Sequence, residues 1–290
     1  MLLEAPTSES VADWIETSVL VSDSGHFAAQ KLAELAAAEI QKNEAALELG
    51  LQVMRRRSQA LGDSYPFVVN EFAVVRSGAA IETSYATMLF LTPGSPARQT
   101  VRINETPQMA ETFEALATVG LSNFWGPGGD SVRFAYPSAI GRPKEFDQAI
   151  EWLANRMGVE AGTGYRPPRR KDGGVDVVAW RSFRDGRRGF PIALAQCTIQ
   201  GETFTKTTDI DLRLWASWLA MDSDPLSMLV IPGTIRAAGP AWNQLASVVM
   251  PIERLRLTEL ICRSRVPPPP DEWTDDTANE LREILLASDS

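Results

Sequence analysis

The sequence predicts an α/β protein whose central sheet lies in the second half of the chain, after a mainly helical first half. From residue 141 onward, apolar runs of strand length alternate with amphipathic helical patterns, which is typical of α/β domains. Before residue 140, Ala/Leu/Glu-rich segments with apolar residues at helical spacing dominate. The 290 residues are enough for one large domain or two modest ones.

In the second half, a helix, two strands, a second helix and a further strand follow one another. The first helix has one apolar face between Phe146 and Met157 and ends at Gly158, a residue that favours the left-handed conformation at a helix end. The expected strands are residues 175–180, 191–199 and 226–231, and residues 209–219 are expected to form the second helix. These elements predict a central sheet flanked by helices.

The first half has fewer strand patterns. Residues 24–61 predict one long helix, residues 67–75 a strand and residues 106–119 an amphipathic helix. Residues 85–91 form a short apolar run, and the Gly-Pro-Gly-Gly segment after Trp125 indicates a tight turn. We expect a helical regulatory, recognition or assembly region at residues 1–140, the sheet domain at residues 141–266, and a proline linker with a helix at residues 267–290.

Composition excludes several classes of protein. Cys197 and Cys262 are the two cysteines, and neither lies in a C-x-x-C pattern, which argues against a disulfide scaffold or a zinc site. His26 is the one histidine, at the start of the expected long helix, so Ser/His/Asp catalysis is excluded. No run approaches the roughly 20 apolar residues of a membrane span, and the first residues do not resemble a secretory signal. We therefore expect a cytoplasmic protein without membrane contact.

Charge is unevenly distributed along the chain. The net charge is −9, but residues 165–190 contain eight Arg or Lys against three Asp, a local net charge of +5. Arg166, Arg169, Arg170 and Lys171 are the candidates for contact with a nucleic-acid phosphate backbone. A solvated arginine-rich loop is the alternative.

Acidic and amide side chains in the two expected strands suggest a metal site. Asp176 lies in the first strand after a Gly-Gly pair, and an acid between apolar runs is costly unless it is used or paired. In the second strand, alternation places Gln196 and Thr198 on one face, where they can lie beside Asp176. Oxygen ligands of this kind hold the divalent ions of phosphodiesterases. There are simpler alternatives: Asp176 only begins a strand, and Gln196 only forms a hydrogen bond to a neighbouring residue.

Three segments resemble the Mrr-type restriction endonucleases of the PD-(D/E)XK nuclease superfamily. Phe146-Asp147 through Leu153 to Gly158 resembles the "FE…LL…G" helix of that family. The segment KDGGVDVV from Lys171 resembles its "DGGIDLV" strand, and LAQCT, ending at Thr198, resembles its "VQCK" strand. The resemblance implies a restriction-endonuclease-like core, a mixed central sheet flanked by helices.

The resemblance also implies site residues. Asp147 would be the helix-borne carboxylate, Asp176 the central metal ligand, and Gln196 with the Cys197 backbone carbonyl the further ligands of Mg²⁺ or Mn²⁺. The chain departs from the family pattern at Thr198, where the family has a lysine. The hydroxyl of a threonine cannot supply the positive charge that the lysine provides. Lys206, eight positions downstream, is the candidate for a relocated catalytic lysine, with a solvated lysine as the alternative.

The function implied is a metal-dependent endodeoxyribonuclease in a restriction-like or phage-defence system. Its partners would be DNA and other defence-system subunits, in a homodimer or a hetero-complex. A catalytically degenerate nuclease-fold subunit, acting in nucleic-acid binding or complex assembly, is the alternative that Thr198 keeps open. A protein-binding scaffold that uses the C-terminal helix is a third.

Overall fold

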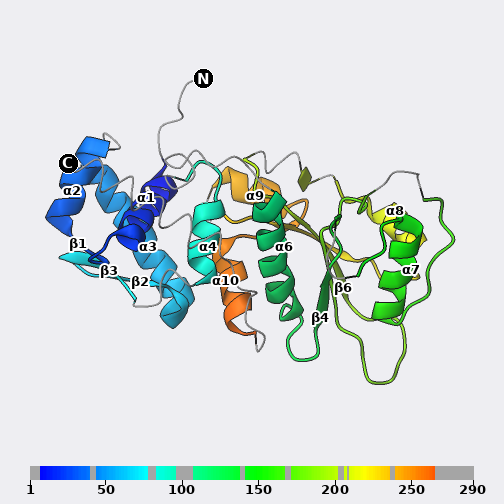
Figure 1. Ribbon diagram of the computed structural model, residues 1–290. Helices are drawn as coiled ribbons and strands as arrows, with labels where there is room; N and C mark the ends of the chain where they lie inside the picture. Colours follow the sequence, from blue (N-terminus) through cyan, green and yellow to red (C-terminus); the bar gives the residue numbers. More distant parts are fainter. Residues whose placement is uncertain are drawn as a thin grey trace. The chain divides into compact units, whose positions relative to one another are not determined.

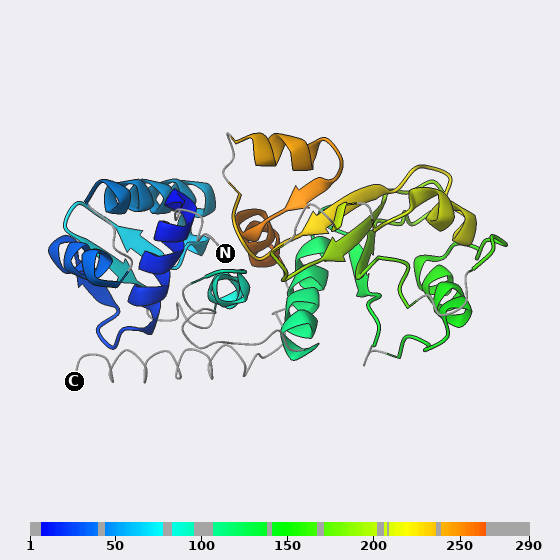
Figure 2. The same cartoon turned by 90° about the horizontal axis from the view of Figure 1, so that it is seen from above.

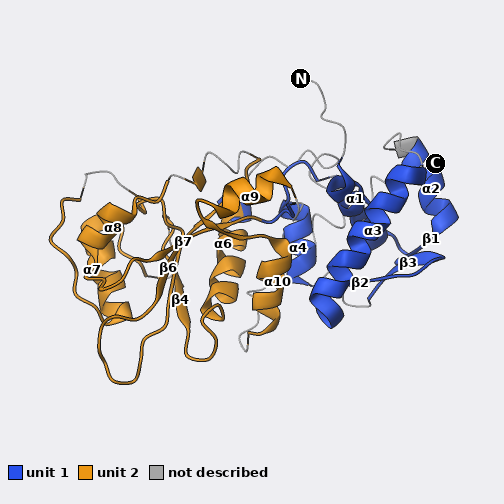
Figure 3. Ribbon diagram, turned by 180° about the vertical axis from the view of Figure 1, so that it is seen from behind, with its two compact units in different colours: residues 1–109, 232–236, 270–290 blue, residues 110–231, 237–269 orange. Residues whose placement is uncertain are grey.

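The computed structural model describes residues 7–39, 44–77, 83–95, 107–137, 141–166, 171–201, 206–207, 209–235 and 239–264. The chain divides into two compact units, coloured separately in Figure 3. Unit 1 comprises residues 1–109, 232–236 and 270–290, and unit 2 comprises residues 110–231 and 237–269. The expected C-terminal linker and helix at residues 267–290 lie outside the described residues.

Unit 1 combines helices with a small antiparallel sheet. The sheet has the order β1-β3-β2, with His26 opposite Val75 and Val69 opposite Val74. The elements are α1 (Ser8–Val21), β1 (His26–Ala28), α2 (Ala29–Glu39), α3 (Glu44–Leu61), a 3-10 turn (Gly62–Ser64), β2 (Phe67–Val69), β3 (Ala73–Arg76) and α4 (Ser84–Leu91).

Two expectations for the first half differ from the structure, each because of a local turn. The single helix expected at residues 24–61 is instead strand β1 followed by two separate helices, α2 and α3. Helix α2 begins only after β1, because Gly25 adopts a left-handed φ of 59° and residues 26–28 pair with β3. The strand expected at residues 67–75 is a hairpin, because the side chain of Asn70 accepts the N–H groups of Phe72 and Ala73 and turns the chain.

Helix α4 explains the short apolar run at residues 85–91. All seven of these residues are buried, so the helix has no polar face whose period could identify it. No helix in the described part of the chain is long and apolar enough to cross a membrane.

A buried charge cluster joins α1 and α3. The guanidinium of Arg57 in α3 binds Asp13 at 2.7 Å and Glu16 at 2.8 Å, both in α1, and Glu9 at 3.0 Å. Arg57 Nη2, which binds Glu9, also donates to the Thr234 hydroxyl at 2.8 Å, so Thr234 is part of this cluster. The phenol groups of two tyrosines, Tyr65 and Tyr85, also donate to Glu16.

Unit 2 is built on a mixed five-stranded sheet of order β4-β5-β6-β7-β8. Strands β4, β5 and β6 are mutually antiparallel, and β7 and β8 continue from β6 in parallel. The expected α/β architecture, a mixed sheet flanked by helices after a helical N-terminal part, is confirmed. The elements are α6 (Pro107–Ser122), β4 (Asp130–Arg133), α7 (Phe146–Met157), β5 (Val177–Trp180), β6 (Ile192–Cys197), α8 (Leu212–Trp218), β7 (Leu226–Val230), α9 (Pro240–Ala246), β8 (Met250–Ile252) and α10 (Arg254–Cys262).

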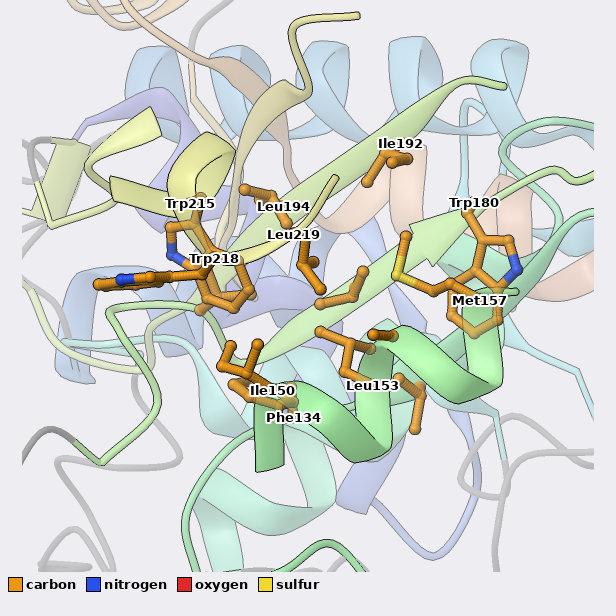
Figure 4. Packing of buried hydrophobic residues seen from close by; sticks show 14 of the residues in the cluster. Phe134, Ile150, Leu153, Met157, Trp180, Ile192, Leu194, Trp215, Trp218 and Leu219 are labelled. Atoms are coloured by element: carbon orange, nitrogen blue, oxygen red, sulfur yellow. The ribbon is translucent and has the colours of Figure 1, made fainter. Parts of the chain in front are cut away.

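Helices cover both faces of this sheet. Helices α7 and α8 pack on the face that bears Val178 and Leu194, where Ile150, Leu153 and Trp215 join the same apolar cluster (Figure 4). Figure 1 shows α6 and α10 on the other side of the sheet, and the view from above keeps α6 and α7 apart in the same way (Figure 2). Alternate residues of each strand therefore face different helices.

The division between the units falls after residue 109, whereas we expected a boundary at residue 140. Residues 110–137 belong with the sheet because β4 is the antiparallel partner of β5, with Arg133 opposite Val177. Helix α6 belongs there too, because its Thr118 carbonyl accepts the Ser131 hydroxyl of β4 at 2.6 Å.

Candidate active site

Asp176 occupies the point where three strands meet. Its N–H donates to the Ala195 carbonyl at 2.9 Å, and its carbonyl accepts the N–H groups of Phe134 at 2.6 Å and Ala135 at 3.0 Å. Its side-chain carboxylate accepts the Cys197 N–H at 2.7 Å. The backbone of Asp176 is thus fixed by both neighbouring strands, and its carboxylate lies at the end of β6.

The Gly-Gly pair before Asp176 shapes the turn that delivers it. Asp172 accepts the Gly174 N–H at 3.0 Å, and Gly173 and Gly174 have left-handed φ values of 69° and 80°. A Cβ on Gly174 would lie 2.3 Å from the Asp209 carbonyl oxygen, so only glycine allows this close approach. The indole of Trp215 in α8 donates to the Gly173 carbonyl at 3.1 Å and holds the turn against the core.

Two carboxylates share the space beside β5. Burial first, and then the negative charge of Glu114, raise the pKa of Asp176 to about 8, although the hydrogen bond from Cys197 acts to lower it. Burial also raises the pKa of Glu114, against the lowering effect of Arg133, whose Nε lies 2.6 Å from its carboxylate. The positive charge of Arg133 therefore does not compensate both acids.

The helix-borne carboxylate at this site comes from α6, not from α7. Glu114 in α6 acts electrostatically on Asp176 and is bound by Arg133 of β4. Asp147, expected in this role, lies in the first turn of α7 with 68% of its side chain exposed, and its contact is Arg166 at 3.4 Å. The structure thus brings Asp176 together with Glu114, whereas Asp147 lies on the helix that packs on the opposite face of the sheet.

Gln196 and Lys206 converge on one aspartate. Gln196 is buried in β6 and donates its amide N–H to Asp209 Oδ2 at 2.8 Å, and Lys206 Nζ lies 3.5 Å from the same oxygen. The amide oxygen of Gln196, Oε1, is buried and has no hydrogen-bond partner among the described residues. Such an oxygen is costly to bury unless it has a ligand to bind.

Thr198 is committed to a local turn. The side chain is buried, with the residue 5% exposed, and its hydroxyl accepts the N–H of Gln200 at 3.1 Å. Thr198 lines a hollow of about 130 Å³ together with Glu114, Cys197 and Lys206. The position that the resemblance reserves for a lysine and the candidate for the relocated lysine thus border the same space.

Cys197 brings its thiol to this hollow as well. Burial raises its pKa, and the negative charges of Asp176 and Glu114 raise it further, so the sulfur remains a protonated thiol near neutral pH. The backbone of Cys197, whose carbonyl is the expected metal ligand, is anchored through its N–H by Asp176.

The expected phosphate-binding segment is described in part. Arg166 donates to the Gly162 carbonyl at 2.7 Å and pairs with Asp147, and 13% of its side chain is exposed. Lys171 is exposed, and its backbone carbonyl accepts a hydrogen bond from Arg142. Arg169 and Arg170 lie outside the described residues.

The oxygens at this site suit a hard divalent cation. No group of three or more His, Cys, Asp or Glu side chains gathers into a metal-holding cluster within the described residues. The oxygens available are instead the carboxylates of Asp176 and Glu114, of which Glu114 acts electrostatically on Asp176, and, on the adjoining strand β6, the unpaired amide oxygen of Gln196. Mg²⁺ accepts one or two carboxylates with neutral oxygens completing its shell, so the chemistry of these residues fits it.

Sequence reasoning missed Glu114, Arg133 and Asp209. One feature of the sequence could have located Glu114 and Arg133. Residues 159–170 are rich in Gly, Pro and Arg and hold no strand pattern, so the antiparallel partner of β5 has to come from before α7. That partner is β4, and the helix that precedes it is α6.

No protein-family model, no curated protein and no solved structure matches this chain. The resemblance to the PD-(D/E)XK nucleases therefore rests on the three segments that contain Asp147, Asp176 and Thr198.

Proposed function

We propose that this chain is a divalent-cation-dependent nuclease that hydrolyses phosphodiester bonds of DNA on a restriction-endonuclease-like core. The observation that carries the proposal is the pair of carboxylates at the end of the β5–β6 pairing: burial raises the pKa of both Asp176 and Glu114, and the negative charge of Glu114 adds to the raised pKa of Asp176. When bound, Mg²⁺ or Mn²⁺ activates a water molecule and offsets the charge that builds up on the phosphate. The resemblance extends the proposal to a restriction-like or phage-defence role.

In this proposal the chain supplies the ion's oxygens from four residues. Asp176 and Glu114 would hold the ion with their carboxylates, and Gln196 with its free amide oxygen. The Cys197 backbone carbonyl would complete the set that the resemblance implies. Arg133 keeps the Glu114 carboxylate oriented through its 2.6 Å hydrogen bond.

Lys206 provides the positive charge that Thr198 cannot. It lines the hollow that Glu114 and Thr198 also line, and Asp209 holds it 3.5 Å away. Because Asp209 also accepts the Gln196 amide, the position of Lys206 is tied to β6. In the proposal its ammonium faces the scissile phosphate or the attacking water.

The test is cleavage of supercoiled plasmid and linear duplex DNA with Mg²⁺ or Mn²⁺, and without cleavage in EDTA. Asp176→Asn and Glu114→Gln should each abolish cleavage, whereas Asp147→Asn, which changes an exposed carboxylate on α7, should cleave like the wild type. Cleavage that survives Asp176→Asn would show that the activity belongs to a contaminant or to another site.

A second candidate is a degenerate nuclease-fold subunit that binds DNA or assembles with partners without cutting. The observation that favours it is the engagement of the Thr198 hydroxyl by Gln200 and of Lys206 by Asp209, which leaves no uncommitted cation in the hollow among the described residues. Wild-type protein that binds DNA in EDTA but cuts none with either metal supports this candidate.

A further inference from the structure

The connection between β5 and β6 presents arginines and an aromatic ring to solvent. Arg184 and Arg187 are exposed and form no ion pair with any described residue. Between them and the strand lies Phe183, with 53% of its surface exposed, and the guanidinium of Arg181 lies 5.9 Å from its ring centre. Arg188 pairs with Glu160 at 3.9 Å and with Asp222 at 3.8 Å.

This combination suits one class of partner. Guanidinium groups form paired hydrogen bonds with phosphate oxygens, and an exposed aromatic ring offers a flat surface on which a base can stack. The loop is also a local exception in a chain of net charge −9, which repels a polyanion elsewhere.

We infer that residues 181–189 form a nucleic-acid contact in which Arg184 and Arg187 bind backbone phosphates and Phe183 stacks on an accessible base. The loop is distinct from the candidate active site, because β5 and β6 are antiparallel and the loop joins their other ends. The hollow is lined by Cys197 and the residues that follow β6, whereas the loop precedes Ile192 at the start of that strand.

The spacing between loop and site fits one strand of DNA. The six residues of β6 span roughly 16 Å at about 3.3 Å per residue. That is about five nucleotide steps of 3.4 Å. This part of the inference rests on the proposed function, since it takes the hollow as the cleavage site. A DNA strand that lies along the β5–β6 hairpin then contacts both the loop at residues 181–189 and the hollow.

The test is binding of a fluorescein-labelled duplex two helical turns long (about 20 base pairs) and of its single strand, measured by anisotropy in EDTA. Arg184→Ala/Arg187→Ala should weaken binding at least about tenfold and reduce the slope of log affinity against log salt by about 1.8 on the duplex. Phe183→Ala should weaken single-strand binding about tenfold, and Phe183→Leu nearly as much, because leucine keeps apolar surface but not the flat ring.

The matched control is Lys31→Ala/Arg213→Ala, which removes two exposed positive charges from α2 and α8. If the loop double variant binds no worse than this control, the inference is wrong. It is equally wrong if the loop variants leave DNA binding intact but lose binding to vesicles of anionic lipid or to an acidic peptide. If DNA binding depends on the loop but the protein never cleaves DNA, the inference stands and the proposed function is wrong.

Discussion

The side chain of Asp176 accepts the backbone N–H of Cys197 at 2.7 Å, beyond the last ladder pair of β5 and β6, Val177 with Ala195. A carboxylate thus takes the place that a strand carbonyl holds elsewhere in the sheet. The same carboxylate is buried next to Glu114, so the structural hydrogen bond and the raised pKa belong to one group. Protonation of Asp176 therefore links the stability of the sheet to pH.

We expect the free energy of unfolding to fall as pH rises from about 4 to about 8. Asp176 has a pKa of about 8 in the folded chain, well above that of an ordinary carboxyl, about 4. Between these values the folded state keeps a proton that the unfolded state releases, so each rise in pH favours unfolding, by at most about 1.4 kcal/mol per pH unit. Asp176→Asn should flatten this dependence, as measured by urea unfolding in EDTA across that range.

Other ionisable groups contribute equally to the pH dependence of the unfolding free energy in both proteins. The difference in that dependence between wild type and Asp176→Asn therefore reports on Asp176 alone. Parallel pH profiles would contradict the assignment. Saturating Mg²⁺ should also reduce the wild-type dependence, because a bound cation favours the carboxylate over the protonated acid.

Lys206→Met should reduce DNA cleavage by about 100-fold or more, the usual effect of removing a group that stabilises charge in a transition state. Binding measured in EDTA should not change, since the lysine acts on one phosphate among many. Adding Thr198→Lys should restore part of the activity, because Thr198 and Lys206 line the same hollow. Wild-type cleavage by Lys206→Met would exclude its catalytic role.

Arg57→Met should lower the free energy of unfolding of the N-terminal unit by about 3–5 kcal/mol, because it leaves three acidic side chains without their shared cation. Arg56→Met is the matched control: 60% of the Arg56 side chain is exposed and it lies 3.9 Å from Glu9, so its loss should cost at most about 0.5 kcal/mol. Urea unfolding followed by circular dichroism compares the two. Equal effects would mean that the buried cluster adds nothing.

Gly174→Ala should destabilise the chain more than Gly126→Ala. Both glycines have left-handed φ values, 80° and 74°, so both substitutions carry a backbone cost of roughly 1–2 kcal/mol. At Gly174 the new Cβ also meets the Asp209 carbonyl at 2.3 Å, whereas at Gly126 it meets nothing within 4 Å. Similar unfolding midpoints for the two variants would show that the turn before Asp176 has room to relax.

The parts of the fold that sequence reasoning reached are those that neighbouring residues determine. Helix α7 has its apolar face and its glycine end within a dozen residues, and Gly158 adopts the expected left-handed φ of 72°. Asp176 follows the same rule, because the Asp172 turn and the two glycines that position it are adjacent in sequence.

The parts that sequence reasoning missed depend on packing between distant segments. Strand β1 has three residues and exists because it pairs with β3, and nothing within residues 26–28 indicates this. Glu114 reaches the site because α6 covers one face of the sheet, and its helical pattern alone gives no hint of which strand it faces. Asp147 matches the family motif in sequence, but it lies on α7, which packs on the face of the sheet opposite to α6 (Figure 1).

Thr234 completes the Arg57 cluster from 177 positions further along the chain. A ribosome that has released α1 and α3 has not yet made this residue, and it makes β4 through β7 first. The N-terminal unit therefore acquires this hydrogen-bonding group of the α1–α3 charge cluster only after β4 through β7 have been synthesised, so formation of the two units is interleaved in time.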